Sequence, residues 1–237
     1  MEYLYGKDMT ELRRLCEELS LPRFAAGQIA RWLYRRHTTD AAAMTDLPAA
    51  ARVRLAERCD TGLSAPVGVS TSSDGTKKYL FRTVQGHFIE SAYIPDGDRA
   101  TLCVSSQAGC RMGCRFCAST LDGLERNLTA SEMLDQVYRI QRETGERVSN
   151  VVVMGSGEPM DNYDNLVRFI RLLTDENGLN ISQRNVTVST CGLIPGIRRL
   201  ADEGLPVTLA LSLHAPNDEV RRELMPIART YALKDVL

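Results

Sequence analysis

The stretch Cys110-Arg-Met-Gly-Cys-Arg-Phe-Cys117 places three thiols within eight residues. A closed structural zinc site usually takes four ligands from two separated pairs, and no histidine or further cysteine lies nearby to complete that set. Three thiolates on one short loop can hold three irons of a [4Fe-4S] cluster, because soft sulfur ligands suit iron–sulfur centres. The fourth iron would be open to a ligand from outside the protein. Three structural cysteines, or a zinc site with a distant fourth ligand, are the alternatives.

Size, charge and composition narrow the class of protein. The chain has 237 residues, with 29 Lys and Arg against 30 Asp and Glu, so a local basic surface would have to supply any affinity for RNA. It has no apolar run of about 18 residues and no signal-peptide pattern, which predicts a soluble, cytoplasmic protein with no membrane partner. Seven cysteines in such a chain favour metal or redox chemistry over a disulfide scaffold.

The first 60 residues are predicted to form a small helical domain. Periodic apolar residues predict helices over residues 10–19, 25–36 and 48–59. The second helix is expected to turn Ile29, Trp32 and Leu33 inward and to show Arg31, Arg35, Arg36 and His37 to solvent. The arginines are candidate phosphate contacts, and a solvated helix face is the alternative.

Along residues 61–95 the alternation of apolar and polar residues changes to a period of two. Residues 77–82 and 87–94 pair naturally as strands of a hairpin around Gln85-Gly86. Glu90 stands in the second strand among apolar neighbours. An ordinary solvent-facing strand position is one interpretation of this carboxylate.

Residues 96–237 alternate between strands and helices, as four strand–helix units. Strands are predicted over residues 100–106, 150–154, 185–190 and 206–213. The helices that follow are predicted from the capping box Thr129–Glu132 onward, then over residues 162–174 and 195–203, and from the cap Asn217 to Pro226. Parallel strands joined by helices form right-handed crossovers, in either a barrel or a doubly wound sheet.

The places of the polar residues favour the barrel. The three-thiol loop, Gly155-Ser-Gly-Glu158, Ser189-Thr190 and Ser212-Leu-His214 all lie at, or just beyond, the C-terminal ends of predicted strands. In a barrel those ends converge on one face, where active sites are built. The predicted fold is therefore α/β, a partial (βα) barrel over residues 96–237, preceded by the helical domain and the hairpin segment.

The motifs together resemble a known family. The Cys-x-x-x-Cys-x-x-Cys pattern resembles the signature of radical S-adenosylmethionine (SAM) enzymes. Its surroundings, from Thr101 to Cys117, look like the rRNA/tRNA adenine-C2 methyltransferases of the RlmN family and their C8-methylating relatives of the Cfr group. The N-terminal pattern Leu21-Pro-Arg-Phe…Gln28-Ile…Trp32-Leu-Tyr…Met44-Thr-Asp-Leu-Pro48 matches the accessory domain of that family. The resemblance runs from about Leu12 to the last residue.

The resemblance implies a fold, cofactors and partners. The fold would be a partial radical SAM barrel, with about four of the family's six units in this sequence. The cofactors would be a [4Fe-4S] cluster and SAM. The substrates would be 23S rRNA and tRNA, held in part by residues 1–60, and electrons would come from a donor such as flavodoxin or ferredoxin. The protein would be a monomer.

The resemblance also implies roles for single residues. Cys110, Cys114 and Cys117 would hold the cluster, and the residues matching SAM-binding positions are Gly157, Glu158, Ser189, Ser212, Leu213 and His214. Glu90 would be the general base that takes a proton from adenine, and Cys103 would resolve the protein–RNA adduct through a disulfide. A tight turn at 157–158, an isolated serine at 189, a structural histidine at 214 and a buried thiol at 103 are the corresponding alternatives.

In the family, a cysteine on a later C-terminal segment carries the methyl group as a methyl-cysteine. That residue has no counterpart in this sequence, and Cys191, which follows the third predicted strand, is not assigned the role. We therefore expect the chain alone not to methylate RNA catalytically. A C8-methylating enzyme and a non-catalytic protein that binds the cluster or RNA are the alternative functions.

Overall fold

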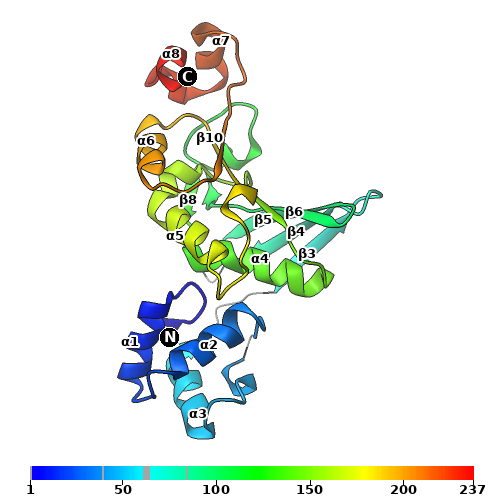
Figure 1. Cartoon of the computed structure of the whole chain (residues 1–237). Coiled ribbons are helices and arrows are strands. Elements are labelled where there is room, and N and C mark those ends of the chain that lie inside the picture. The colour runs from blue at the N-terminus through cyan, green and yellow to red at the C-terminus, as the bar shows by residue number, and fades with distance from the viewer. Residues whose placement is uncertain (1, 39, 61–64, 84) are drawn as a thin grey trace.

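A computed structural model describes residues 2–38, 40–60, 65–83 and 85–237 of the chain. Helices α1 to α3 form a unit at one end, and a seven-stranded sheet with helices on one face forms the body of the molecule (Figure 1). The short helices α7 and α8 lie at the opposite end from α1 to α3. Within the described ranges, no helix is long and apolar enough to cross a membrane.

The three predicted N-terminal helices are confirmed, as α1 (Met9–Glu18), α2 (Ala25–Tyr34) and α3 (Ala49–Arg58). Asp8 and Glu11 form a capping box that satisfies the first N–H groups of α1. Strand β1 (Glu2–Tyr3) pairs in parallel with β2 (Cys59–Asp60), so the two ends of this unit meet. The short helix η1 (Ala41–Ala43) lies between α2 and α3.

The helical unit packs directly on the body of the molecule through tyrosines. The ring of Tyr5 lies 5.1 Å from that of Tyr138 in α4 (Ala130–Thr144). Arg168 of α5 (Tyr163–Thr174) donates a hydrogen bond of 3.1 Å from Nε to the carbonyl of Gly6 and contacts the carboxylate of Glu11. These contacts fix the unit against α4 and α5.

His37 corrects one expectation about the second helix. Arg31, Arg35 and Arg36 are exposed as predicted, but the ring of His37 is half-buried, 4.8 Å from the ring of Tyr138. Burial lowers the pKa of His37, and a backbone hydrogen bond with Tyr34 partly opposes this shift. The aromatic partner belongs to a helix about a hundred residues later, so the local period of α2 could not reveal it.

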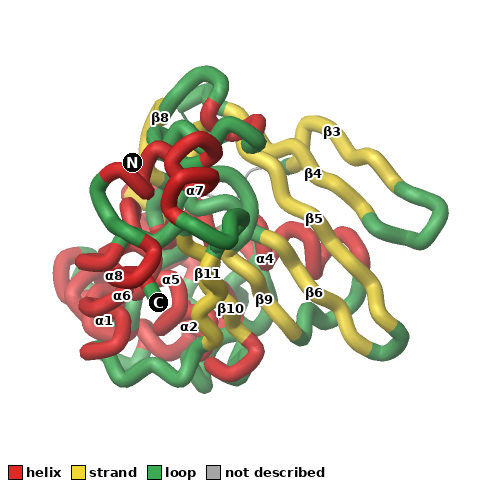
Figure 2. The backbone as a smooth tube through the Cα atoms, turned by 90° about the horizontal axis from the view of Figure 1, so that it is seen from above, coloured by secondary structure: helices red, strands yellow, loops and turns green. Residues whose placement is uncertain are grey.

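The central sheet has the strand order β11-β10-β9-β6-β5-β4-β3. Its strands are β3 (Pro66–Thr71), β4 (Lys77–Arg82), β5 (Phe88–Asp96), β6 (Arg99–Cys103), β9 (Asn150–Val153), β10 (Val186–Thr190) and β11 (Thr208–Leu211). Strands β6, β9, β10 and β11 run parallel to one another, and the pairs β3–β4, β4–β5 and β5–β6 are antiparallel. The predicted hairpin of β4 and β5 is confirmed, and it extends the same sheet as the parallel strands. Figure 2 shows this sheet from above.

The parallel strands alternate with helices as predicted. The helices are α4 and α5, α6 (Ile194–Asp202) and α7 (Asp218–Leu224), and the short α8 (Leu233–Val236) follows. Thr129 and Glu132 form the expected capping box of α4. Short helices complete the connections: η2 (Ala118–Thr120), η3 (Pro159–Asn162), η4 (Gln183–Asn185) and η5 (Pro226–Arg229). A small hairpin, β7 (Gln107–Gly109) and β8 (Leu124–Asn127), lies between β6 and α4 and is not predicted by the sequence patterns.

The two faces of the sheet differ. Buried side chains such as Val151, Val153 and Val188 join Leu134 of α4 and Phe169 of α5 in one apolar core. Successive strand residues point to opposite faces, so the intervening residues face away from the helices. Ala92 of β5 is paired with Cys103 of β6, and therefore Glu90, two residues from Ala92, shares the face of Cys103.

Candidate active site

The three-thiol loop begins where β7 ends. Cys110 and Cys114 are buried and Cys117 is half-buried. The N–H of Cys110 donates to the carbonyl of Gly123 at 2.8 Å, and the N–H of Cys117 donates to the carbonyl of Cys114 at 3.0 Å. A backbone turn thus fixes the end of the loop, and the hydrogen bond to Gly123, just before β8, fixes its start.

Gly109 is required by this close approach. Its φ of +71° lies in the left-handed region, and a Cβ there would lie 2.0 Å from the carbonyl oxygen of Gly123. Gly113 also has a positive φ, of +70°, and packs against Pro226. Both glycines thus allow the loop to wrap tightly, Gly109 against Gly123 and Gly113 against Pro226.

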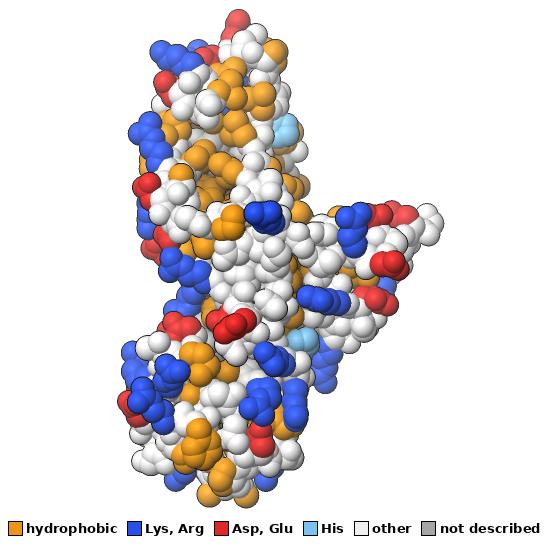
Figure 3. Space-filling view, in the orientation of Figure 1, with side chains coloured by type: hydrophobic (Ala, Val, Ile, Leu, Met, Phe, Trp, Pro, Cys, Tyr) orange, Lys and Arg blue, Asp and Glu red, His pale blue; other side chains and the backbone are white. Residues whose placement is uncertain are grey.

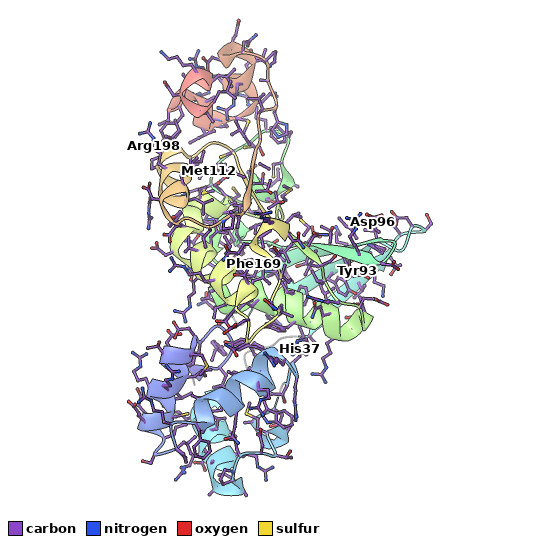
Figure 4. All side chains as sticks on the ribbon, in the orientation of Figure 1. His37, Tyr93, Asp96, Met112, Phe169 and Arg198 are labelled. Carbon is purple, nitrogen blue, oxygen red and sulfur yellow. The ribbon has the colours of Figure 1, made fainter. Side chains whose placement is uncertain are left out.

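The thiols open onto a cavity of about 220 Å³. Its lining joins the three cysteines to side chains from the next three strand ends, namely Glu158, Ser189, Cys191 and Ser212. Met112 of the loop, labelled in Figure 4, marks its position between α6 and the α7–α8 end. The convergence of polar residues at the C-terminal ends of the parallel strands is therefore present, as the sequence predicts.

Glu158 is the buried carboxylate of this cavity, with 4% of its surface exposed. Its Oε1 accepts a hydrogen bond of 3.1 Å from the N–H of Met160, and its Oε2 accepts one of 2.8 Å from the N–H of Cys191. Two charge-assisted bonds fix the carboxylate, and each oxygen keeps lone pairs for a further donor.

Gly157 permits the approach of this segment to β7. Its φ is +104°, and a Cβ there would lie 2.7 Å from the backbone nitrogen of Gln107. The side chain of Gln107 then accepts a hydrogen bond of 2.8 Å at Oε1 from the N–H of Glu158. Packing against Gln107 therefore requires glycine at position 157, whether or not a ligand is bound.

A polar network around the buried Gln107, which the sequence patterns miss, connects the three-thiol loop to the loop of Glu158. Nε2 of Gln107 donates to Asp161 at 3.0 Å and to Asn127 at 2.7 Å. Arg111, inside the three-thiol loop, donates from Nε to the same Asp161 carboxylate at 2.9 Å. Asp161 therefore joins the thiol loop to the segment that carries Glu158.

The serines expected at the strand ends lie together. The Oγ atoms of Ser189 and Ser212 are 3.3 Å apart, and both residues line the cavity. Leu213 and His214 are not among the described residues that line it. His214 is exposed, has a φ of +53°, and its ring lies 4.4 Å from that of Phe116 in the thiol loop.

Glu90 and Cys103 lie on the face of the sheet away from the helices, outside the cavity lining described above. Half of the Glu90 side chain is exposed, and its carboxylate pairs with Nζ of Lys78 at 2.8 Å. Cys103 is half-buried at the end of β6; burial raises the pKa of its thiol, and a backbone hydrogen bond with Met154 partly opposes the shift. The structure places both side chains on one face but does not bring them into contact with the three thiols.

Cys191 is a buried thiol in contact with Cys114 and Met225. Burial raises its pKa strongly, and the neighbouring Glu158 carboxylate adds to the shift. A neutral, enclosed thiol is a poor nucleophile. The interpretation that Cys191 does not carry methyl groups stays a prediction. All seven cysteines lie among the described residues, and no disulfide joins any two of them.

The donor set fits a cluster better than a single ion. Among the described residues, no group of three Cys, His, Asp or Glu side chains is close enough to hold one metal ion. The three thiols instead border a shared cavity, and a four-iron cluster is wider than an ion. Burial raises the pKa of Cys110, and burial together with Cys110 and Cys117 raises that of Cys114 to about 11. A cationic iron–sulfur core would favour the thiolates that this cavity otherwise disfavours.

Comparison with known proteins agrees with this site. The family model of the radical SAM superfamily matches residues 104–237, and that of the ribosomal RNA large subunit methyltransferase N-terminal domain matches residues 3–60. A protein of Clostridium novyi named "Probable dual-specificity RNA methyltransferase RlmN" is 44% identical over 100% of this chain and 69% of its own length. The chain belongs to the RlmN family of the radical SAM superfamily.

Further relatives carry the same name. The relative from Lachnospira eligens is 56% identical over 91% of this chain, and that from Symbiobacterium thermophilum is 50% identical over 99%. The chain spans 62% and 64% of the length of these two proteins, less than two thirds of each. The crystal structure of a radical SAM methyltransferase from Sphaerobacter thermophilus superposes with a TM-score of 0.94 at 45% identity, over 100% of this chain and 70% of that one. The predicted family and fold class are thereby confirmed.

Proposed function

We propose that this chain supplies the cluster-binding, SAM-binding and RNA-binding parts of a methyltransferase that acts on C2 of an adenine in 23S rRNA and in tRNA. The observation that carries the proposal is the cavity that three thiols share with Glu158 and two serines. The names of the relatives support an RNA substrate.

In this proposal, Cys110, Cys114 and Cys117 would hold three irons of a [4Fe-4S] cluster, and the fourth iron would be left for SAM. When bound, the cluster and SAM supply the one-electron chemistry that methylation of an electrophilic ring carbon requires. The electrons would come from a donor of the flavodoxin or ferredoxin type. Cys110 and Cys114 are buried, so these two cluster ligands would be shielded from solvent.

Glu158 is proposed to bind the amino group of SAM. Its carboxylate is buried and already held by two N–H groups, so it can accept a further hydrogen bond without first losing side-chain freedom. Gly157 lets the backbone come close. Ser189 and Ser212 offer a pair of hydroxyls suited to the ribose or carboxylate of SAM. Leu213 and His214 are proposed to contact SAM from beside Phe116.

Glu90 and Cys103 are proposed to act on the RNA. An exposed carboxylate beside Lys78 can be reached by a base that lies over the open face of the sheet. There Glu90 would take the ring proton, and Cys103 would form a disulfide with the carrier cysteine as the bond between that cysteine's sulfur and the product carbon breaks. Their shared face supports a common substrate, because the register pairs Cys103 with Ala92.

The RNA backbone is proposed to lie along the junction between the helical unit and the body. Arg13, Arg31 and Arg35 line a cavity of about 430 Å³ there, together with Asn177 from the loop after α5. Arg35 and Arg147 line a neighbouring cavity of about 350 Å³. Figure 3 shows Lys and Arg side chains around this junction. Guanidinium groups on both sides of a groove suit phosphates.

The test is anaerobic reconstitution with iron and sulfide, followed by incubation with reductant and SAM. We expect reductive cleavage of SAM to 5′-deoxyadenosine by the wild type and none by Cys114→Ser. A wild-type protein that binds about four irons but does not cleave SAM would contradict the proposal. Analysis of RNA methylated by a family-length version then separates 2-methyladenosine from 8-methyladenosine.

A further inference from the structure

Arg221 is a fully buried cation beside the candidate site, with 0% of its surface exposed. Its Nη2 donates a hydrogen bond of 2.7 Å to the carbonyl of Cys191. Its Nε and Nη1 are buried without a hydrogen-bond partner among the described residues. Burying a guanidinium costs several kcal/mol unless it is well paired. Stability alone therefore does not account for an arginine at this position.

The element that carries Arg221 is docked on the three-thiol loop. The carbonyl of Leu224, in the last turn of α7, accepts a hydrogen bond of 2.9 Å from the N–H of Arg115. Met225 follows and packs in one small buried cluster with Cys114 and Cys191. Pro226 lies next to Gly113, 3.3 Å from the place of a Cβ on that glycine. The backbone of α7 thus has a fixed position relative to the thiols.

The side chain of Arg221 extends from α7 to the turn that holds Glu158. The carbonyl of Cys191 accepts the hydrogen bond from Arg221. The N–H of Cys191 donates a hydrogen bond of 2.8 Å to Oε2 of Glu158. The next residue, Gly192, has a φ of +104°, and a Cβ there would lie 3.2 Å from Nη2 of Arg221 and 3.1 Å from Val236. The turn is therefore held between the arginine and Glu158.

We propose that Arg221 is a positioning residue, which fixes the Glu158 carboxylate relative to the three-thiol loop so that one SAM molecule can reach both. The three-thiol loop and Glu158 are far apart in sequence, yet both must present their groups to one ligand. Arg221 lies on α7, which is docked on the three-thiol loop, and its side chain binds the turn that orients Glu158. This inference rests on the proposed function, in which Glu158 binds the amino group of SAM.

The test compares Arg221→Met, which keeps the length and removes the donors, with Arg222→Met, its exposed neighbour on α7. Arg221→Lys keeps the cation and one donor. The reconstituted chains are measured for bound iron, for thermal stability, and for the SAM concentration that gives half of the SAM-dependent change in the reduced EPR signal. Gly192→Ala disturbs the same turn by an independent route.

We expect all variants to bind about four irons and Arg221→Met to be at least as stable as the wild type, because it removes a buried unpaired cation. Its half-saturating SAM concentration should rise about tenfold, a loss of about 1.4 kcal/mol. Arg221→Lys should recover part of that loss, Gly192→Ala should share the defect, and Arg222→Met should match the wild type.

Equal SAM affinity in Arg221→Met and Arg222→Met would overturn the proposal, as would loss of iron together with SAM, or no recovery in Arg221→Lys. A wild type that binds iron but gives no SAM-dependent change would instead overturn the proposed function, whatever the variants do.

Discussion

Glu158 and Cys191, at the ends of the neighbouring strands β9 and β10, are joined by a hydrogen bond of 2.8 Å from the N–H of Cys191 to Oε2 of Glu158. Together with the N–H of Met160 it orients a buried carboxylate toward the cavity of the three thiols. The carboxylate is thus in place before any ligand arrives, which reduces the entropy lost on binding.

Glu158→Gln tests the need for this negative charge. The variant keeps the shape of the side chain but loses the charge-assisted hydrogen bond to a cationic ligand, a type of bond that contributes about 1.5–3 kcal/mol. We expect SAM affinity to fall about tenfold to a hundredfold, with iron content unchanged, by equilibrium binding to the reconstituted protein. The control is Glu223→Gln, at an exposed position of α7. Equal affinities in the two variants would show that Glu158 does not bind SAM.

The basic junction is tested by the salt dependence of RNA binding. Replacing Arg13, Arg31 and Arg35 with Gln should reduce the slope of log affinity against log salt by about two to three, because each phosphate contact releases a counterion. Filter binding or fluorescence anisotropy over a salt series measures this slope. A control variant carries three exposed arginines outside both junction cavities, Arg14, Arg23 and Arg54. Equal slopes in the two variants would show that Arg13, Arg31 and Arg35 do not contact RNA phosphates and form an ordinary solvated helix face.

His37 predicts a pH-dependent contribution to stability. Burial lowers its folded-state pKa below the value of about 6.5 expected in the unfolded chain. The unfolded state then binds more protons, so this contribution is complete above about pH 6.5 and is lost as the pH falls through the folded pKa. We expect His37→Phe, which keeps a ring against Tyr138, to lose less stability than the wild type between pH 7.5 and 5.5 in urea unfolding. An equal loss in both would contradict the assignment.

Much of the fold follows from patterns that act locally. The apolar run at residues 151–153 and the capping box at Thr129 each indicate their element without knowledge of distant neighbours. The gathering of strand-end residues follows in turn, because parallel strands present their C-terminal ends together.

The parts that the sequence could not predict depend on contacts between distant segments. His37 is shielded by Tyr138, about a hundred residues later, and Arg221 meets Cys191 through a turn that only the tertiary structure defines. In the sequence Asp161 is an ordinary loop residue, and only the folded structure brings Arg111 and Gln107 within hydrogen-bond distance of it. Side-chain hydrogen bonds of this kind have no sequence period, and therefore no pattern signals them.

The most direct test of the central claim is the reduced EPR spectrum of the reconstituted protein, recorded with and without SAM. Three cysteines that leave one iron open predict about four irons per chain and a spectrum that changes when SAM is added. The single variants Cys110→Ser, Cys114→Ser and Cys117→Ser should each abolish that change, whereas Cys59→Ser, at a cysteine outside the cavity, should retain it. An unchanged response to SAM in all three loop variants would contradict the account.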